Sequence, residues 1–266
     1  MKIAIQTGGA ISHFGLESTL YAFKKADFKA IDWNDPTGID LKKILDGDGS
    51  DNIFEMDIEG IKNHFNPTLA IFKKHEIEIT QMHAPFPAYI PGAPQLLDYM
   101  IEVYKKLILL ADYAKCKNVV IHGICTRSDH PEDTKEYIDS LNLKMYEALI
   151  PTILKTNVTV CLENLFTWKP GVPFEGAGHC SDADEAIEII DTLNKKAGKE
   201  CFGLCFDTGH ALLVGIDVKD YITKLGFRIK ALHIHDNDGA LDLHRSPYTG
   251  NFNWDDFCEA LNGIDY

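Results

Sequence analysis

The chain has 266 residues, of which 45% are hydrophobic and 25% charged, and its formal net charge is −14. This size and balance are typical of a globular protein with one large α/β domain or two small ones. No apolar run approaches the ~20 residues that cross a bilayer, and the start, MKIAIQTGGA, lacks the apolar stretch of a secretory signal. The negative charge repels polyanions, so nucleic acid is not expected as a partner.

The chain carries seven cysteines, an odd number, and none of them form a CxxC pair. Several lie in or beside apolar runs, where free thiols pack as small hydrophobic groups. This usage favours reduced cysteines in a reducing compartment. We therefore predict a cytoplasmic protein that does not bind membranes.

Short runs rich in Val, Ile, Leu and Phe alternate with longer amphipathic stretches along the chain. Nearly continuous apolar runs of this kind are typical of strands buried on both faces of a parallel sheet. The strands are predicted at residues 2–6, 29–33, 77–83, 118–123, 157–164, 201–207 and 229–236.

Helical patterns fill the intervals between the strands. In the third helix apolar residues recur every three or four positions, and Pro94 suits its first turn. In the fifth, Ser181 and Asp182 are candidate caps, and Gly198 is a candidate terminator. The helices are predicted at residues 16–26, 57–75, 94–115, 132–154, 181–198 and 254–262.

Seven strand-then-helix units over about 260 residues predict an α/β fold, a (β/α)8 TIM barrel, with a single domain over residues 1–266. A doubly wound sheet is the rival fold, but no GxGxxG follows the first strand. After the last helix the chain reads NGIDY, so the eighth strand is missing from the sequence. Two parallel edges would then stay open, and we expect the natural protein to continue past Tyr266 with a strand.

Metal-capable or acid–base residues close every predicted strand from the third to the seventh. The C-terminal ends of barrel strands face one shared mouth, where residues distant in sequence converge. Carboxylates are rarely buried there unless they are paired or metal-bound, which predicts a divalent cation. A mixed histidine and carboxylate set favours zinc, manganese, iron or cobalt. The candidate ligands are His83, His122, Glu163, Asp207, His210, His233, Asp242 and His244.

Each residue of this set also has an ordinary structural explanation. Asp207 with Thr208 and Gly209 reads equally as a simple turn. His233 and His235 either point to one face of a strand, or the strand breaks at His235 and only one of them reaches the metal. The histidines that fit no strand-end pattern, and that we interpret as structural or solvated, are His13, His64, His75, His130 and His179.

Six segments give the chain a resemblance to the xylose isomerase-like barrel superfamily. This superfamily holds sugar phosphate isomerases and epimerases, hydroxypyruvate isomerase, inosose dehydratase and endonuclease IV. Together the segments are specific for the superfamily but select poorly among its members. They are MHAPFP (82–87), VVIHG (119–123), VCLEN (160–164), FDTGHA (206–211), LHIHDND (232–238) and DLHRSPYTGNFNW (242–254).

The resemblance implies a ligand set for a central metal: Glu163, Asp207 and His233. The fourth ligand of the sugar enzymes is usually a Glu on the eighth strand, which this sequence does not contain. His210 matches a position that touches substrate in the sugar enzymes and a further metal in the nuclease. The positions that match other zinc ligands of the nuclease are His83, His122, Asp242 and His244.

The activity implied is that of a metal-dependent sugar or sugar phosphate isomerase or epimerase of carbohydrate metabolism, acting by proton transfer next to a carbonyl through an enediolate. Glu163 and His210 are the expected catalytic residues, with Glu163 as the base. The second acid would be the absent eighth-strand Glu, so a chain that ended at Tyr266 is expected to show little epimerase activity. Phe86, Phe166 and Trp168 either pack on the sugar or pack only their own loops.

Three other functions remain open. An endonuclease IV-like multi-zinc phosphodiesterase fits the ligand set, but the charge of −14 and the lack of basic loops oppose it. An inosose dehydratase-type lyase would use the same metal, and a non-catalytic sugar-binding barrel would use only the pocket. We expect a small-molecule sugar or sugar phosphate as the partner, and a homodimer is compatible with such barrels.

Overall fold

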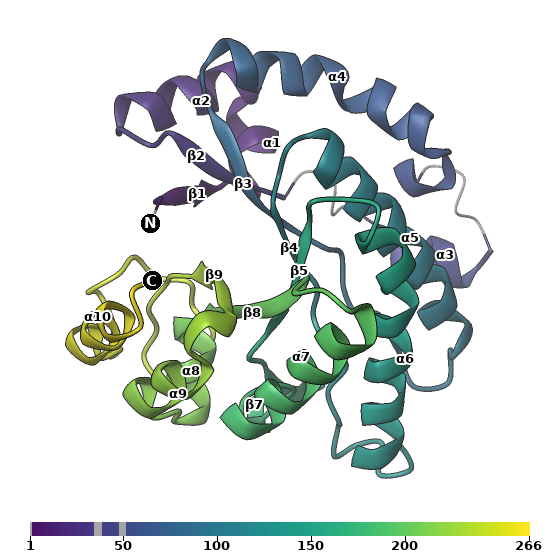
Figure 1. Ribbon diagram of the computed structural model, residues 1–266, viewed down its shortest axis with the longest axis vertical. Helices are drawn as coiled ribbons and strands as arrows, with labels where there is room; N and C mark the ends of the chain where they lie inside the picture. The colour runs from purple at the N-terminus through teal and green to yellow at the C-terminus, as the bar shows by residue number, and fades with distance from the viewer. Residues whose placement is uncertain (1, 35–38, 48–51) are drawn as a thin grey trace. The chain divides into compact units, whose positions relative to one another are not determined.

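The structure is a computed structural model that describes residues 2–34, 39–47 and 52–266 (Figure 1). The residues fall into two compact units. The first comprises residues 1–121 and 151–158, and the second residues 122–150 and 159–266. The single domain expected over residues 1–266 stays a prediction.

Four parallel strands in chain order form the sheet of the first unit. The second strand is buried along its whole length, as expected for a strand covered on both faces. Its Trp33 packs edge-on against Phe65 and Phe72, with ring centroids 5.1 and 5.5 Å apart. The strands are β1 (Ala4–Gln6), β2 (Ala30–Trp33), β3 (Glu78–His83) and β4 (Asn118–Val120).

The helices of the first unit lie between these strands in the chain. Asp57 caps the longest helix before the third strand, because its carboxylate accepts a hydrogen bond from the amide of Gly60 at 2.8 Å. The helices are α1 (Ala10–Phe14), α2 (Leu16–Lys25), α3 (Leu41–Leu45), the 3₁₀ helix η2 (Ile53–Glu55), α4 (Ile58–Lys74) and α5 (Gln95–Tyr113).

In the second unit, three parallel strands and an antiparallel hairpin surround the candidate site. Every residue of the middle strand is buried. The register pairs Asp207 with His233 and Glu163 with Cys205, so the carboxyl ends of the strands lie together. The parallel strands are β5 (Thr159–Glu163), β8 (Phe202–Asp207) and β9 (Ile229–His233), and the hairpin is β6 (Phe166–Lys169) with β7 (Val172–Ala177).

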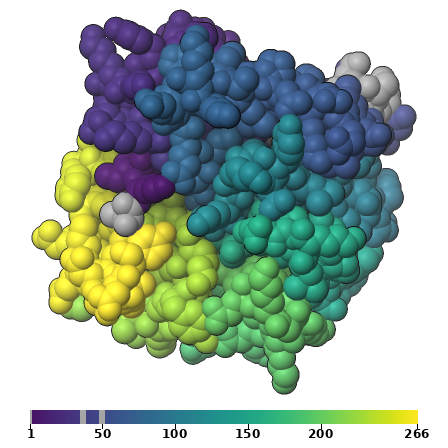
Figure 2. Space-filling view, turned by 45° about the horizontal axis from the view of Figure 1, so that its top comes forward, coloured from purple at the N-terminus to yellow at the C-terminus, as the bar shows by residue number. Residues whose placement is uncertain are grey.

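The caps of α7 (Ala183–Ala197) follow the sequence signals closely. Of the two candidates, Asp182 is the cap, accepting hydrogen bonds from Asp184 and Glu185 amides, and Gly198 ends the helix in a left-handed conformation at φ 66°. The last helix lies at the surface, in yellow in Figure 2. The remaining helices are α6 (Lys135–Ile153), α7 (Ala183–Ala197), α8 (Thr208–Val214), α9 (Val218–Leu225), the 3₁₀ helix η3 (Gly226–Arg228) and α10 (Trp254–Gly263).

All seven predicted strands and six predicted helices are present, with ends that differ by up to three residues. Phe166 and Trp168 were expected to lie in a loop, and they lie instead in β6, which pairs antiparallel with β7. The seventh strand was expected to run to residue 236 and ends at His233, after which Asp236 pairs with Arg245. No strand follows β9 in the described stretch up to Tyr266, and no described helix has the length and hydropathy needed to cross a bilayer.

Candidate metal centre

Three strands of the second unit end on an ionisable residue: β5 on Glu163, β8 on Asp207 and β9 on His233. Asn164 joins the first two ends, since its amide group donates to the carbonyl of Asp207 at 2.9 Å and accepts from the Asp207 amide at 2.7 Å. Glu163 and Asp207 are each only 1% exposed. Two carboxylates are therefore fixed side by side in a buried position, which requires compensating positive charge.

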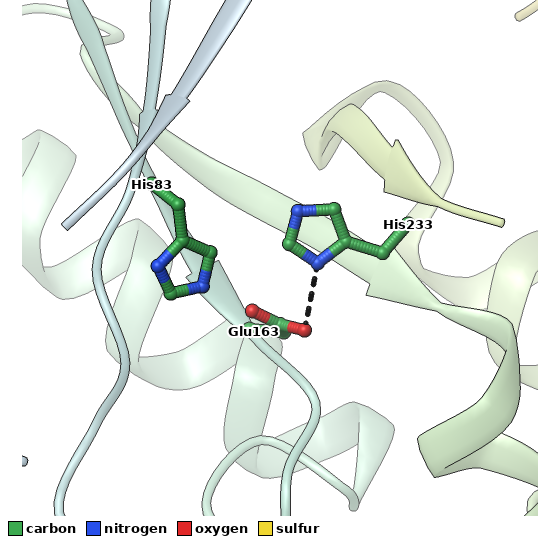
Figure 3. Close-up of side chains that lie close together, drawn as sticks. All are labelled: His83, Glu163 and His233. Atoms are coloured by element: carbon green, nitrogen blue, oxygen red, sulfur yellow. Dashed lines mark hydrogen bonds and ion pairs between the residues drawn. The ribbon is translucent and has the colours of Figure 1, made fainter. Parts of the chain in front are cut away.

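Histidine rings contact both oxygens of Glu163. Nδ1 of His233 lies 2.9 Å from Oε1 (Figure 3), and Nε2 of His122 lies 2.9 Å from Oε2. The same Nδ1 of His233 is 3.7 Å from Oδ2 of Asp207. His233 therefore lies within 4 Å of both Glu163 and Asp207, and the role of these three residues as ligands of a central metal stays a prediction.

Asp207 also begins α8 and orients a second histidine. Its Oδ1 accepts a hydrogen bond from the His210 amide at 2.7 Å, so the simple turn considered from the sequence is a helix cap. The His210 ring places Nδ1 3.0 Å from the carbonyl of Asn164 and 3.4 Å from Oε1 of Glu163. Because a carbonyl oxygen only accepts, Nδ1 carries a proton, and Nε2 lies 3.7 Å from Asp242 Oδ2.

A buried carboxylate holds the loop that carries Asp242. Asp236 is 0% exposed and accepts hydrogen bonds from the amides of Asn237 and Phe252 and from the Trp254 indole, at 2.9, 3.1 and 3.0 Å. A Cβ on Gly250 would lie 2.1 Å from the carbonyl oxygen of Asn237, so only glycine fits there.

On this loop, Nε2 of His244 donates to Oδ2 of Asp242 at 3.0 Å. The two residues face one point, as their spacing predicted, although they lie on a loop and not on a strand.

His235 belongs to the cluster and was absent from the predicted ligand set. Its Nε2 donates to Oδ2 of Asp207 at 2.9 Å, and its ring stacks on His244 at 3.9 Å. A Cβ on Gly209 would lie 2.0 Å from the ring, so glycine is needed for this approach. The alternating positions of His233 and His235 in HIHD pointed to a shared face for the two rings. That argument assumes a continuous strand, and β9 ends at His233.

The donor set of the second unit fits a divalent cation. Nδ1 of His235 and Oδ1 of Asp242 are both buried without a hydrogen-bond partner among the described residues, and they lie 4.0 Å apart. The donor atoms of His235, Asp242 and His244 all lie within 4.8 Å of one another, as do those of Asp207, His210 and His235. The His235 side chain is buried, with 8% of its surface exposed. Imidazole and carboxylate donors together favour zinc, manganese, iron or cobalt.

The cluster shifts the ionisation of its members. Burial would raise the pKa of Glu163, but charged His233 and His122 beside it hold that pKa well below its usual range. Burial likewise opposes ionisation of Asp207, and His210 and His235 outweigh it and lower the pKa. Burial opposes charge on His210, yet the nearby Asp207, Asp242 and Glu163 raise its pKa to about 9. Without a cation, protonated histidines supply the positive charge that the carboxylates need.

His83 ends β3, as predicted, and belongs to the first unit. Its ring is buried, with Nδ1 2.7 Å from the carbonyl of Ala84 and an edge contact to Phe86 at 5.5 Å. Its role as a metal ligand stays a prediction.

The aromatic side chains predicted near the site differ in their surroundings. Phe166 meets the His210 ring edge-on at 5.0 Å, while Phe86 and Trp168 are 57% and 52% exposed.

Three of the other histidines have structural partners. His179 is buried, with Nδ1 3.4 Å from Glu185. His75 lies 2.5 Å from Glu17, and His130 lies 3.0 Å from Glu132. These contacts agree with the structural interpretation of the three rings.

Comparison with known proteins identifies the class of fold. Residues 44–266 match the family model described as "Xylose isomerase-like TIM barrel". The chain therefore belongs to the xylose isomerase-like TIM barrel family, which confirms the predicted fold class.

Solved structures with a similar fold include sugar epimerases. A D-tagatose 3-epimerase-like protein has a TM-score of 0.70 at 20% identity, with 100% of this chain and 88% of that chain covered. An L-ribulose 3-epimerase has a TM-score of 0.66 at 18% identity, covering 100% and 79%. The IOLI protein, with a bound zinc atom, has a TM-score of 0.70 at 20% identity, covering 99% and 85%. At sequence identities of 20% and 18%, these similarities show the fold alone.

Two curated relatives carry no assigned function. An uncharacterized protein of Sinorhizobium fredii is 27% identical over 173 residues, which is 62% of this chain and 50% of the relative. An uncharacterized protein of Methanocaldococcus jannaschii is 24% identical over 201 residues, covering 73% of this chain and 63% of the relative. The chain thus spans between half and two thirds of the length of these relatives.

Proposed function

We propose that the protein is a divalent-metal-dependent isomerase or epimerase of a small sugar. The observation that carries the proposal is the meeting of Glu163, Asp207 and His233, where one ring nitrogen lies 2.9 Å from one carboxylate and 3.7 Å from the other. Similar folds among sugar epimerases, and a zinc atom in the IOLI protein, support it.

Glu163, Asp207 and His233 would hold the catalytic cation. When bound, the cation would polarise the sugar carbonyl and favour loss of the neighbouring proton. The remaining steps belong to the protein's own groups, and the short contacts of Glu163 with two rings fix the direction of its carboxylate.

Glu163 is proposed as the base that removes the proton next to the carbonyl. Its Oε2 is oriented by Nε2 of His122, and its low pKa keeps it ionised at neutral pH. His210 directs Nε2 toward Asp242, at 3.7 Å, because Nδ1 is held by the carbonyl of Asn164. This nitrogen would contact a substrate oxygen and orient the sugar.

A second candidate function has one observation in its favour. The cluster offers more donors than one cation needs, since the Asp242 carboxylate lies 3.7 Å from His210, 4.0 Å from His235 and 3.0 Å from His244. A multi-zinc phosphodiesterase would use such a set. His235 suits a ligand in either case, because its Nε2 donates a hydrogen bond to Asp207 and Nδ1 is left to bind a cation, as in carboxylate–histidine–metal arrangements.

The test is proton exchange at carbon. Purified protein is stripped with a chelator, reloaded with manganese, zinc, cobalt or iron(II), and incubated in D2O with a panel of ketoses and ketose phosphates. We expect deuterium to enter the carbon next to the carbonyl of at least one sugar, only in the reloaded protein, by proton NMR. Cleavage of abasic DNA with about three zinc ions per chain, and no exchange into any sugar, would instead support the phosphodiesterase.

A further inference from the structure

One of the two rings that contact Glu163 stands on a segment outside the regular secondary structure. The strand β4 ends at Val120, and the chain from residue 121 to residue 127 forms no helix or strand. The register of a strand therefore does not set the position of His122. Its Nε2 nevertheless lies 2.9 Å from Oε2 of Glu163. The contacts of the residues that follow His122 must hold this segment in place.

A buried asparagine of α6 binds both backbone groups of Ile124. Oδ1 of Asn142 accepts a hydrogen bond from the Ile124 amide at 2.7 Å, and its Nδ2 donates to the Ile124 carbonyl at 2.9 Å. Asn142 is 0% exposed and Ile124 is 7% exposed. Buried backbone groups outside a helix or strand need such side-chain partners. Asn142 thus does for this segment what a neighbouring strand does inside a sheet.

The residue His179 holds the same segment at two further points. A Cβ on Gly123 would lie 2.0 Å from Cδ2 of the His179 ring, so glycine is needed for this approach. The amide of His179 donates to Sγ of Cys125 at 3.3 Å. The three residues after His122 are therefore all in contact with buried side chains or backbone of other segments.

Asparagine side chains bind the backbone in the same way at both ends of β8. At its carboxyl end, Asn164 bonds to the amide and the carbonyl of Asp207. At its amino end, Oδ1 of Asn194 accepts from the Cys201 and Phe202 amides, both at 2.8 Å, and Nδ2 donates to the Phe202 carbonyl at 3.0 Å. The second contact stands at the end of the strand that carries no residue of the site, so Asn194 is a matched control for Asn142.

We propose that Asn142 is a positioning residue of the centre: by holding Ile124 it keeps Nε2 of His122 on Oε2 of Glu163, and so fixes the direction of that carboxylate. The inference rests on the proposed function, since it concerns the orientation of the proposed base. A displacement of ~1 Å at a reacting group can cost about 10²-fold in rate. Loss of the Asn142 amide should therefore slow proton removal, while His233 still contacts Oε1 of Glu163.

The first measurement follows the His122 ring and needs no turnover. The zinc-loaded protein is prepared with isotope-labelled histidine, and the His122 ring signal is assigned by NMR from its absence in His122→Gln. We expect this signal to shift or broaden in Asn142→Ala and to keep its position in Asn194→Ala. Urea unfolding establishes that each variant is folded. Asn142→Ser leaves a smaller cavity and replaces Asn142→Ala if the latter does not fold.

The second measurement is deuterium exchange into the substrate at saturating sugar. We expect Asn142→Ala to lower the exchange rate about 10- to 100-fold and Asn194→Ala to leave it nearly unchanged. Titration with cobalt(II) should give the same cation affinity for both variants as for the unsubstituted protein.

Three results would overturn the inference: a His122 signal that keeps its position in Asn142→Ala, equal losses of exchange in the two asparagine variants, or a loss of cation affinity that accounts for the slower exchange. The proposed reaction fails separately. A His122 signal that shifts only in Asn142→Ala, together with no exchange into any sugar by the unsubstituted protein, would support the positioning role and overturn only the reaction.

Discussion

Two groups of buried carboxylates in the second unit differ in what surrounds them. Asp236 accepts hydrogen bonds from backbone amides and an indole, all of which are fixed donors that cannot lose their protons. Glu163 and Asp207 face mainly imidazole rings, at 2.9 Å for the shortest contacts. Burial opposes ionisation of all three, and their partners nevertheless hold every pKa below its ordinary value.

The difference separates a structural carboxylate from one suited to chemistry. The donors of Asp236 leave no place for another ligand, so its role is to hold the loop with Asp242 and His244. The rings around Glu163 and Asp207 can lose their protons when a bound cation supplies the positive charge in their place, whereas backbone amides and an indole cannot. Similar burial therefore gives one region rigidity and gives the other an exchangeable set of ligands.

The largest effect is expected for Glu163→Gln. The amide keeps the shape of the side chain but cannot remove a proton, so deuterium exchange into the substrate should fall at least ~10³-fold. NMR exchange rates measure the change, and calorimetric titration with the loading metal separates loss of the base from loss of the cation. Deuterium exchange at the same rate as in the unsubstituted protein would show that Glu163 is not the base.

For Asp236→Asn we expect a loss of stability of about 2–4 kcal/mol, because the new amide NH₂ faces N–H groups that lose their acceptor. In the presence of a chelator, the melting temperature should fall by about 5–10 °C. Asp238→Asn on the same loop is the control. Asp238 is exposed and accepts hydrogen bonds from Ala240 and Leu241 amides, which an asparagine oxygen can also accept. Equal shifts for both variants would contradict the structural role of Asp236.

The strand ends were predictable from the sequence because two simple patterns combine there. Apolar runs locate β5, β8 and β9, and parallel strands bring their carboxyl ends to one edge. The polar residues that close those runs, Glu163, Asp207 and His233, must therefore meet. The role of these residues in binding a metal stays a prediction.

Residues outside the strands were harder to predict. His235 joins the centre through Asp207 and Gly209, contacts that depend on where β9 ends and α8 begins. Asp236 looks like any aspartate of a polar loop until its amide and indole donors are known. The hairpin has a local signal in the sequence, because Pro170 and Gly171 stand between two β-rich runs and Gly171 has φ 80°. The places of His235 and Asp236 therefore depend on tertiary contacts, whereas the hairpin depends on the local chemistry of its turn.

A smaller effect is expected for His235→Gln. Glutamine can still bond to Asp207 but lacks an imidazole nitrogen facing Asp242, so cation binding should weaken about 10- to 100-fold. Titration with cobalt(II) against a chelating indicator measures the affinity, and the visible bands of cobalt report its ligands. His244→Gln is the matched control, because its side chain is 59% exposed and its ring lies on the outer side of the stack. A greater loss with His244→Gln would make His244 the ligand.

The smallest effect concerns a charge pair outside the centre. The hydrogen bond from His179 lowers the pKa of Glu185 to about 2 from an ordinary value of 4.5. Stabilisation by this carboxylate is therefore complete above about pH 4.5 and is lost as the pH falls toward 2. Since the Glu185 side chain is 30% exposed, we expect Glu185→Gln to lower the unfolding free energy by only about 1–2 kcal/mol at pH 7. Urea unfolding should show this difference shrinking between pH 4.5 and pH 3, and a difference that stays constant would mean that His179 does not stabilise the charged carboxylate.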